Sequence, residues 1–227
     1  MAERTKARVA RARPDEEQRD GASERLLEAA ERLFVQRGFA ATSVRAITEA
    51  ARCNVAAVNY HFDGKLGLYE TLFRSRLSDL RRRRVESVRA TLDRARGRVT
   101  LELLLTAFAN AFLEPLVEEG PGRHLIGLLS RELLDPHLPP KLFQHEMVEP
   151  VQRVLSEALM RVTPGLRREQ AVHCVISIIG QLTQVSFRCH WAAAAEGCER
   201  LRPRLPAMVE HIARFSAAGV RACAKGR

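Results

Sequence analysis

The chain has 227 residues, of which 46% are apolar and 5% aromatic, and its formal net charge is +10 with a pI near 10.2. This length and apolar content suffice for a sizeable core, in one large domain or in one small and one medium domain. The positive charge favours a polyanionic partner, which leaves nucleic acid and an anionic membrane surface as alternatives.

The apolar runs are too short for a membrane-spanning protein. The longest, such as residues 175–180, fall far below the roughly 20 residues that cross a bilayer, and no apolar signal-peptide core follows the N-terminus. We therefore expect a soluble, cytoplasmic protein with no membrane partner. Its odd number of scattered cysteines is typical of reduced, mostly buried thiols, with redox sensing as the alternative: Cys53, Cys174, Cys189, Cys198 and Cys223.

No run alternates apolar and polar residues over the length of a strand, and Ala, Leu, Arg and Glu dominate, so the predicted fold is all-α. Residues 1–20 are charged throughout and lack an apolar period, which predicts a disordered basic tail. Its residues 4–13 are either solvated or lie in a DNA minor groove as an arm.

The first predicted helix runs from a cap at Ser23 to Arg37, and Gly38 suits its C-terminal end. Its apolar stripe consists of Leu26, Leu27, Ala30, Leu33 and Phe34. These side chains have a structural role, which is to support the helices that follow.

Two short helical patterns meet in residues 42–62 with almost nothing between them. Thr42 or Ser43 can cap the first, and Asn54 can cap the second. The apolar residues of both recur at helical spacing: Val44, Ile47, Ala50 and Ala51, then Val55, Val58 and Phe62. Short helices this close together on one small core predict a helix-turn-helix.

The outward side chains of the second helix suit contact with bases. Ala56 and Ala57 are small and let the backbone approach base edges, and an alanine methyl can touch the methyl group of thymine. Asn59 can pair with adenine through two hydrogen bonds. Tyr60 and His61 are planar groups with polar tips.

This stretch resembles the DNA-binding domain of the TetR family of bacterial transcriptional regulators. The resemblance covers about residues 23–72 and is carried by AAERLFVQRGF, the spacer ATS, the helix VRAITEAA, and NVAAVNYHF followed by GK and an apolar run. The segment NVAAVNYHF with the following GK also looks like the CecR-like branch of the family. The residues predicted to contact DNA are Thr42, Ser43, Arg45, Arg52, Asn54, Val55, Ala56, Ala57, Asn59, Tyr60, His61 and Lys65.

The turn between the two helices departs from the family pattern, because Arg52 stands where the family usually has glycine. A left-handed residue other than glycine costs about 1 kcal/mol, so the turn is either strained or altered in geometry. We expect mild strain, with the Arg52 side chain free to reach a phosphate.

A long helix is predicted from Lys65 to about Arg96. Residues 74–98 hold ten arginines against three acidic residues, so much of the net charge lies here. The run from Arg81 to Arg84 either attracts DNA over long range or is a solvated helix face, and for direct contact we favour the solvated face.

Residues 21–80 are thus predicted to form the DNA-binding domain, and residues 81–227 a helical effector-binding and dimerisation domain. Its helices are expected at residues 101–116, 124–134, 142–160, 167–191 and 205–223. The last two carry broad apolar stripes with interspersed Ala, Gly and Ser, and the resemblance implies that they pack against their twins in a homodimer. Two recognition helices would then read a palindromic operator in double-stranded DNA.

No catalytic constellation, metal-ligand spacing or cofactor motif is found. The resemblance implies a pocket for a small-molecule effector, which Phe108, Phe112, Phe143, Met147, Gln181, Gln184, Phe187 and Arg188 can line, with ordinary core as the alternative for each. The expected function is that of a ligand-responsive regulator, with repression favoured. A non-specific basic DNA-binding protein and a helical small-molecule enzyme remain alternatives.

Overall fold

The structure, a computed structural model, describes residues 14–94, 99–116, 121–196 and 202–226. Every regular element in these ranges is helical, which confirms the all-α prediction. Residues 1–13 of the predicted tail, residues 95 and 96 at the end of the predicted long helix, and Cys198 lie outside them. The chain divides into an N-terminal unit, residues 1–71, and a C-terminal unit, residues 72–227.

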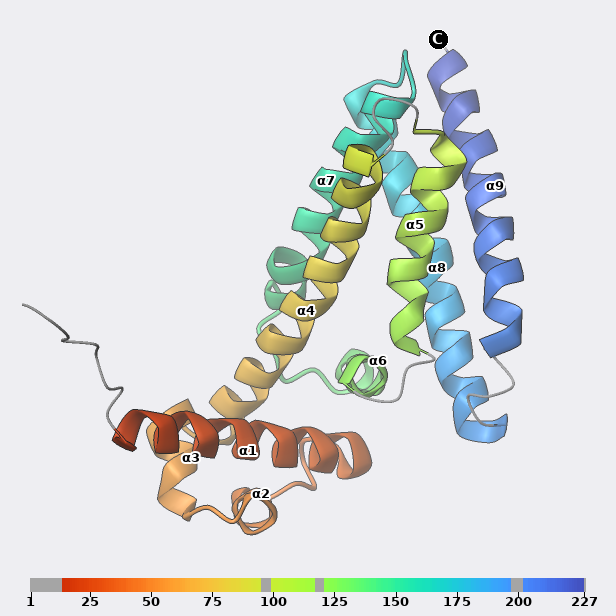
Figure 1. Cartoon of the computed structure of the whole chain (residues 1–227). Coiled ribbons are helices and arrows are strands. Elements are labelled where there is room, and N and C mark those ends of the chain that lie inside the picture. Colours follow the sequence, from red (N-terminus) through yellow and green to blue (C-terminus); the bar gives the residue numbers. More distant parts are fainter. Residues whose placement is uncertain (1–13, 95–98, 117–120, 197–201, 227) are drawn as a thin grey trace, which may run out of the picture. The chain divides into compact units, whose positions relative to one another are not determined.

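The N-terminal unit consists of α1 (Pro14–Arg37), α2 (Val44–Ala51), α3 (Val55–Phe62) and the first turns of α4 (Lys65–Arg94). Figure 1 shows α2 and α3 as short helices that follow the much longer α1. Most of the predicted apolar residues form one core, whose buried side chains include Leu26, Phe34, Ile47, Val58, Phe62, Leu68 and Tyr69. Two residues of the predicted stripes, Ala50 and Val55, are instead exposed. The helix-turn-helix prediction is therefore confirmed.

Helix α1 begins at Pro14 rather than at the predicted cap Ser23. Residues 14–20, which we expected in the disordered tail, are therefore its first turns. A proline is well tolerated at the first position of a helix, because the N–H that it lacks would have no partner there.

The C-terminal unit holds the remainder of α4 together with α5 (Leu101–Leu113), α6 (Pro121–Leu134), α7 (Glu149–Val162), α8 (Arg168–Glu196) and α9 (Leu205–Lys225). Short 3₁₀ turns lie at η1 (Glu114–Leu116) and η4 (Arg202–Arg204). A π-helical turn, η2 (Gln144–Val148), precedes α7, so the predicted helix over residues 142–160 is divided in two.

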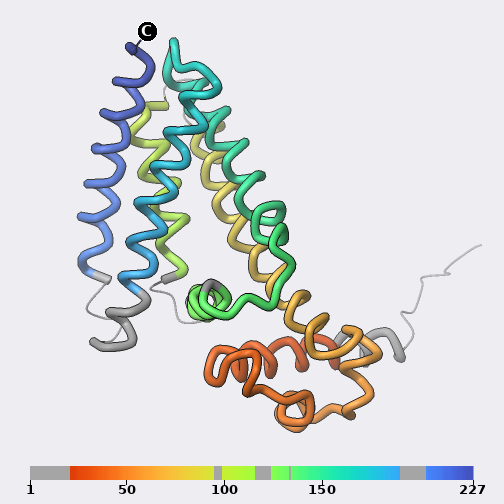
Figure 2. The backbone as a smooth tube through the Cα atoms, turned by 180° about the vertical axis from the view of Figure 1, so that it is seen from behind, coloured from red at the N-terminus to blue at the C-terminus, as the bar shows by residue number. Residues whose placement is uncertain are grey.

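Helices α5, α8 and α9 lie side by side in both views of the backbone (Figures 1 and 2). Their shared core contains Leu104 and Phe108 from α5, Leu182 from α8 and Ile212 from α9, all buried. Helix α7 packs on α8. Both views of the backbone also show α7 beside α4 (Figures 1 and 2), and ion pairs join the η2 turn to α4. The cavity described below opens among α4, α6, α7 and α8.

Candidate DNA-binding surface and ligand cavity

Side-chain caps define where α2 and α3 begin. The Ser43 hydroxyl accepts a hydrogen bond from the N–H of Ala46 at 3.1 Å, and the Asn54 side chain accepts one from the N–H of Ala56 at 3.0 Å. Such caps satisfy N–H groups that have no partner within the helix, and each contributes about 1 kcal/mol. Ser43 and Asn54 thus fix the start and orientation of the two helices.

The turn between α2 and α3 is strained as predicted. Arg52 adopts the left-handed conformation, with φ 53° and ψ 46°, and is exposed. The N–H of the next residue, Cys53, donates to the carbonyl of Thr48 at 2.9 Å, which closes the end of α2. The conformation is one that glycine adopts at less cost, and the Arg52 side chain is left facing solvent.

Helix α3 presents one face to solvent while its other face is buried. Val58 and Phe62 lie in the core, whereas Tyr60 is 69% exposed and Val55 49% exposed. Asn59 is also exposed and lies next to Tyr60 in the sequence. A short helix with a buried apolar side and an open side of this chemistry has the form of a DNA recognition helix.

The other residues predicted to contact DNA differ in exposure, from buried to fully exposed. Thr42 is buried, and its hydroxyl donates to the carbonyl of Gly38 at 2.7 Å, so the structure removes this side chain from the predicted surface. Arg45 is exposed and pairs with Glu49 at 2.9 Å. Ala56 is exposed, while Ala57 and His61 are half-buried.

The start of α4 packs closely on the end of α3. The Lys65 ammonium lies 4.2 Å from the centre of the Phe39 ring, and partial desolvation lowers the pKa of Lys65. At Gly67, a side chain would overlap the carbonyl oxygen of Phe62, so this position requires glycine. The close approach holds the recognition helix against α4.

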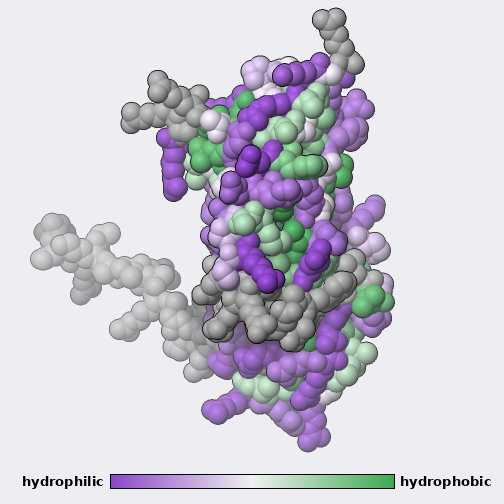
Figure 3. Space-filling view, turned by 90° about the vertical axis from the view of Figure 1, so that its right-hand side faces the viewer, coloured by the Kyte–Doolittle hydropathy of each residue, from purple (hydrophilic) through white to green (hydrophobic). Residues whose placement is uncertain are grey.

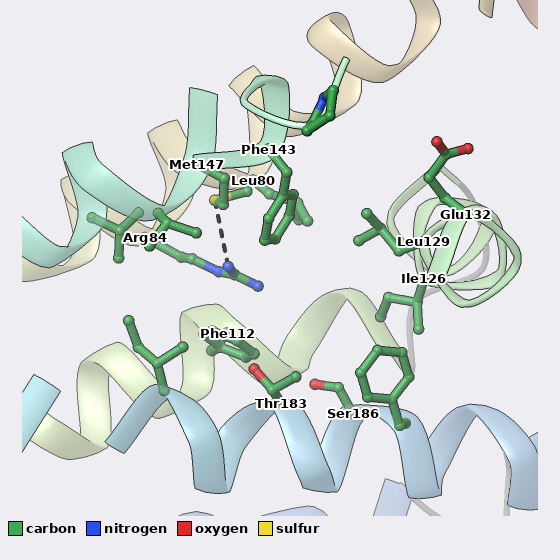
Figure 4. Close-up of a pocket in the computed structure, with 15 residues that line it drawn as sticks. Leu80, Arg84, Phe112, Ile126, Leu129, Glu132, Phe143, Met147, Thr183 and Ser186 are labelled. Carbon is green, nitrogen blue, oxygen red and sulfur yellow. Dashed lines mark hydrogen bonds between the residues drawn. The ribbon is translucent and has the colours of Figure 1, made fainter. Parts of the chain in front are cut away.

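A cavity of about 450 Å³ lies within the C-terminal unit, which falls in the range of small-molecule sites. Figure 4 shows it between α4, α6, the η2 turn and α8, with mainly apolar side chains pointing inward. The lining residues are Leu80, Arg84, Phe112, Ile126, Leu129, Glu132, Pro140, Phe143, Met147, Val148, Val151, Ile179, Thr183, Ser186 and Phe187.

The structure brings half of the predicted pocket residues to this cavity, namely Phe112, Phe143, Met147 and Phe187. Phe108 is fully buried beside Phe112, with ring centres 6.0 Å apart, and is not part of the lining. The other three predicted residues lie elsewhere on α8. Gln181 donates to Ser216 of α9 at 3.4 Å, and Gln184 and Arg188 are exposed.

Arg84 is the lining residue that the sequence analysis missed and that changes the chemistry of the cavity. Its guanidinium lies 3.5 Å from the centre of the Phe112 ring and donates to the Met147 sulfur at 3.5 Å. Its Nε atom is buried without a hydrogen-bond partner. Burial lowers the pKa of Arg84 to about 9, so the side chain remains a cation at neutral pH.

The interpretation of the arginine run as a solvated face is wrong for Arg81 and Arg84. Arg81 pairs with Glu146 at 3.0 Å, and Arg84 points into the cavity. A signal was available in the spacing, because Leu77, Leu80, Arg84 and Val88 recur at helical intervals and the three apolar ones are buried. A run of four arginines is typical of a solvated face, although Arg84 lies at the same helical spacing as the buried residues around it.

Other kinds of site have no support in the described residues. No three or more His, Cys, Asp or Glu side chains come together as possible metal ligands in the part of the chain that the structure describes. Within the same ranges, no helix has the length and apolarity to cross a membrane. Cys174 and Cys189 are buried and Cys223 is exposed, and burial and a hydrogen bond with Cys223 raise the pKa of Cys174 to about 11.

Comparison with known proteins gives two family matches. Residues 26–72 match the N-terminal domain of bacterial regulatory proteins of the tetR family. Residues 101–220, more than half of the chain, match the C-terminal domain of the HTH-type transcriptional dual regulator CecR. The chain belongs to the TetR family, with a CecR-type C-terminal domain. Both parts of the resemblance found in the sequence are thereby confirmed.

The similar curated regulators match over a limited part of their length. The probable HTH-type transcriptional regulator YttP of Bacillus subtilis is 49% identical over 49 residues, which are 22% of this chain and 24% of that protein. The HTH-type transcriptional repressor KstR2 of Rhodococcus jostii is 38% identical over 88 residues, which are 39% of this chain and 42% of KstR2. The matched part thus spans less than half of either relative.

Solved structures of bacterial regulators share the fold over most of the chain. The fatty acid degradation regulator FadR from Bacillus halodurans has a TM-score of 0.64 at 17% identity, covering 86% of this chain and 98% of FadR. A transcriptional regulator from Saccharomonospora viridis, solved in complex with choline, has a TM-score of 0.64 at 16% identity, covering 86% and 95%. At such identities the likeness concerns the fold alone.

Proposed function

We propose that this TetR-family regulator is a homodimeric repressor, that it binds a palindromic operator through α3, and that a small ligand in the cavity releases it. The observation that carries the DNA-binding part is the open face of α3, where Asn59 and Tyr60 are exposed on a helix whose start is capped and whose opposite side is buried. Asn59 and Tyr60 would read base edges, and Arg45, Arg52 and Lys65 would contact phosphates.

Support for a dimer comes from the outer faces of α8 and α9. Ile176 on α8 is 56% exposed and Phe215 on α9 is 64% exposed. Gly180 and Gly219 on the same helices are exposed, and a side chain at either position would meet no other atom within 4 Å. Figure 3 faces the side that carries α9, where apolar and weakly polar residues lie among charged ones.

An exposed stripe with large apolar and small residues is what a helix-helix interface between two copies requires. A dimer is also what a palindromic operator needs, because one eight-residue recognition helix reads only a few base pairs. Exchanging Phe215 for Glu should therefore turn the dimer into a monomer in light scattering, and Arg214→Glu, an exposed neighbour, serves as the control. A monomeric wild-type protein would contradict this part of the proposal.

Release by a ligand requires that the ligand bind one subunit arrangement more tightly than another. Helix α4 is continuous from Lys65 to Arg94 and contributes residues both to the N-terminal unit and to the cavity wall through Leu80 and Arg84. We propose that α4 is the element whose movement couples ligand binding to operator affinity.

Selection of bound fragments from a random duplex library tests the proposed function. We expect the wild-type chain to enrich an inverted repeat whose half-site centres lie about one helical turn, or a multiple of it, apart. Enrichment of no sequence would overturn the proposal and favour the alternative, a basic protein that binds any duplex through its net charge of +10.

A further inference from the structure

The cavity holds a cation, Arg84, that has no counter-charge among the residues that the structure describes. Three arginines of α4 lie near the η2 turn, and Glu146 on that turn pairs with two of them, Arg74 at 2.8 Å and Arg81 at 3.0 Å. Arg84 is bound to neither oxygen, and across the described residues no carboxylate forms an ion pair with it. Its contacts are a thioether and a ring face, which do not neutralise a charge.

The second charged residue of the lining, Glu132, is already satisfied by the backbone. Its Oε1 atom accepts hydrogen bonds from the N–H groups of His137 and Leu138, both at 2.6 Å. Figure 4 shows Glu132 and Arg84 on different sides of the cavity, with Leu129 and Ile126 on the same helix as Glu132. Glu132 therefore orders the segment after α6 and leaves Arg84 uncompensated.

Arg84 is half-buried, and a cation that is partly removed from water without a counter-charge is costly to the free protein. An anion that enters the cavity and pairs with it offsets this cost. We propose that the effector is an amphipathic monocarboxylate, whose carboxylate pairs with the Arg84 guanidinium and whose apolar part fills the rest of the cavity. This inference rests on the proposed function, because it names the class of ligand that the same site would bind.

The lining explains why one carboxylate fits better than other anions. The planar guanidinium, whose tip extends into the cavity (Figure 4), can donate two parallel hydrogen bonds to a carboxylate. Among the described residues of the lining, Arg84 is the one cationic side chain, so the second charge of a phosphate dianion would remain uncompensated there.

The rest of the lining suits an apolar body. Ile126, Leu129 and Phe143 surround the part of the cavity away from Arg84 (Figure 4). Thr183 and Ser186 of α8 place two hydroxyl groups on the opposite wall, and the Ser186 hydroxyl donates to the carbonyl of Leu182 at 2.9 Å. The Ser186 oxygen can still accept a hydrogen bond from a polar group on the ligand.

The test compares acids with their neutral isosteres on the full-length protein. Octanoate, decanoate, octanamide and decanamide are titrated into the wild type, Arg84→Met and Arg89→Met, with binding followed by calorimetry and melting shift. Arg89 is exposed on the same helix and serves as the matched control. We expect the acids to bind the wild type and Arg89→Met at least about tenfold more tightly than the amides, because a hydrogen-bonded charge pair is lost in the amide.

In Arg84→Met the preference should disappear, with acid affinity reduced about tenfold or more and amide affinity equal or higher. Equal binding of acid and amide by the wild type would overturn the inference, and so would an unchanged acid preference in Arg84→Met. Operator binding is measured in the same preparations without any ligand. If the wild type binds its operator but does not prefer acids to amides, the proposal of a carboxylate effector fails and the regulator proposal stands. If it prefers acids but binds no specific DNA sequence, the regulator proposal fails and the carboxylate proposal stands.

Discussion

The recognition helix and the cavity place their functional side chains in opposite environments. On α3 the apolar residues Val58 and Phe62 are buried, and the residues proposed to read DNA, such as Tyr60, face solvent. In the cavity the side chains proposed to contact the ligand point into the interior, and Phe112 and Met147 are as buried as residues of the hydrophobic core. Substitutions on α3 should thus change DNA binding with little effect on stability, whereas substitutions in the cavity should change both ligand binding and stability.

The packing beneath α3 gives the largest expected effect. Gly67→Ala places a methyl group against the Phe62 carbonyl, and separating α4 from α3 should cost about 3 kcal/mol or more. We expect loss of operator binding and a lower melting temperature, measured by gel shift and circular dichroism. Gly21→Ala is the control, because its methyl group meets only the flexible tip of Arg25. Full operator affinity in Gly67→Ala would mean that this close approach is not needed.

A substitution in the cavity should raise stability, whereas Gly67→Ala lowers it. Arg84→Met removes an unpaired buried charge, and we expect the ligand-free protein to gain about 1–4 kcal/mol of stability, seen as a higher melting temperature. A lower melting temperature in Arg84→Met would contradict this expectation, because it would show that the guanidinium stabilises the ligand-free protein.

The same substitution has a pH signature. Because burial lowers the pKa of Arg84 to about 9 in the folded chain, well below that of an arginine in the unfolded chain, its charge destabilises the fold fully below pH 9. The penalty is relieved as the pH rises above 9, where the folded protein loses the proton first. The stability gain of Arg84→Met should therefore be largest near pH 7–8 and smaller at pH 10, as measured by urea unfolding. A gain independent of pH would contradict burial of the charge.

On the exposed face of α3, Asn59→Ala and Tyr60→Ala should each cost about 1–3 kcal/mol of operator binding. The melting temperature should change little, because both side chains are exposed. The control is Leu66→Ala, an exposed apolar residue just after the helix. Equal losses of affinity on operator and random duplex would assign these residues to non-specific binding.

The smallest effect is expected at the turn. Arg52→Gly relieves a left-handed residue and should stabilise the chain by about 1 kcal/mol. Affinity for DNA at low salt should fall, since a phosphate contact is lost, and the salt dependence should weaken. Tighter binding by Arg52→Gly in an anisotropy titration would refute the phosphate role.

The contrast between the two sites also explains which features could be predicted from sequence. Asn59 and Tyr60 stand out because they interrupt an apolar period on a short helix, so the recognition helix was evident, as was the strain at Arg52. Cavity residues follow the same period as core residues, so Phe112 and Phe108 are alike in sequence although only Phe112 lines the cavity. Whether a buried side chain borders other side chains or an open volume depends on tertiary packing.

Arg84 and Gly67 required the structure for different reasons. Arg84 sits within a run of four arginines, where composition suggests solvent and only helical spacing reveals the inward position. The sequence around Gly67 does not indicate that glycine is required there. The requirement arises because the backbone at Gly67 lies close to the carbonyl group of Phe62. The requirement at Gly67 is therefore a distance between two helices, which a local sequence pattern does not contain.

Photo-crosslinking at Tyr60 tests most directly the central claim that α3 reads base edges. A benzoylphenylalanine at this exposed position should crosslink to bases in both half-sites of the selected operator, while the same group at Phe143 of the C-terminal unit should give no crosslink to DNA. Crosslinks at Tyr60 that are absent, or that form equally with any duplex, would contradict the account.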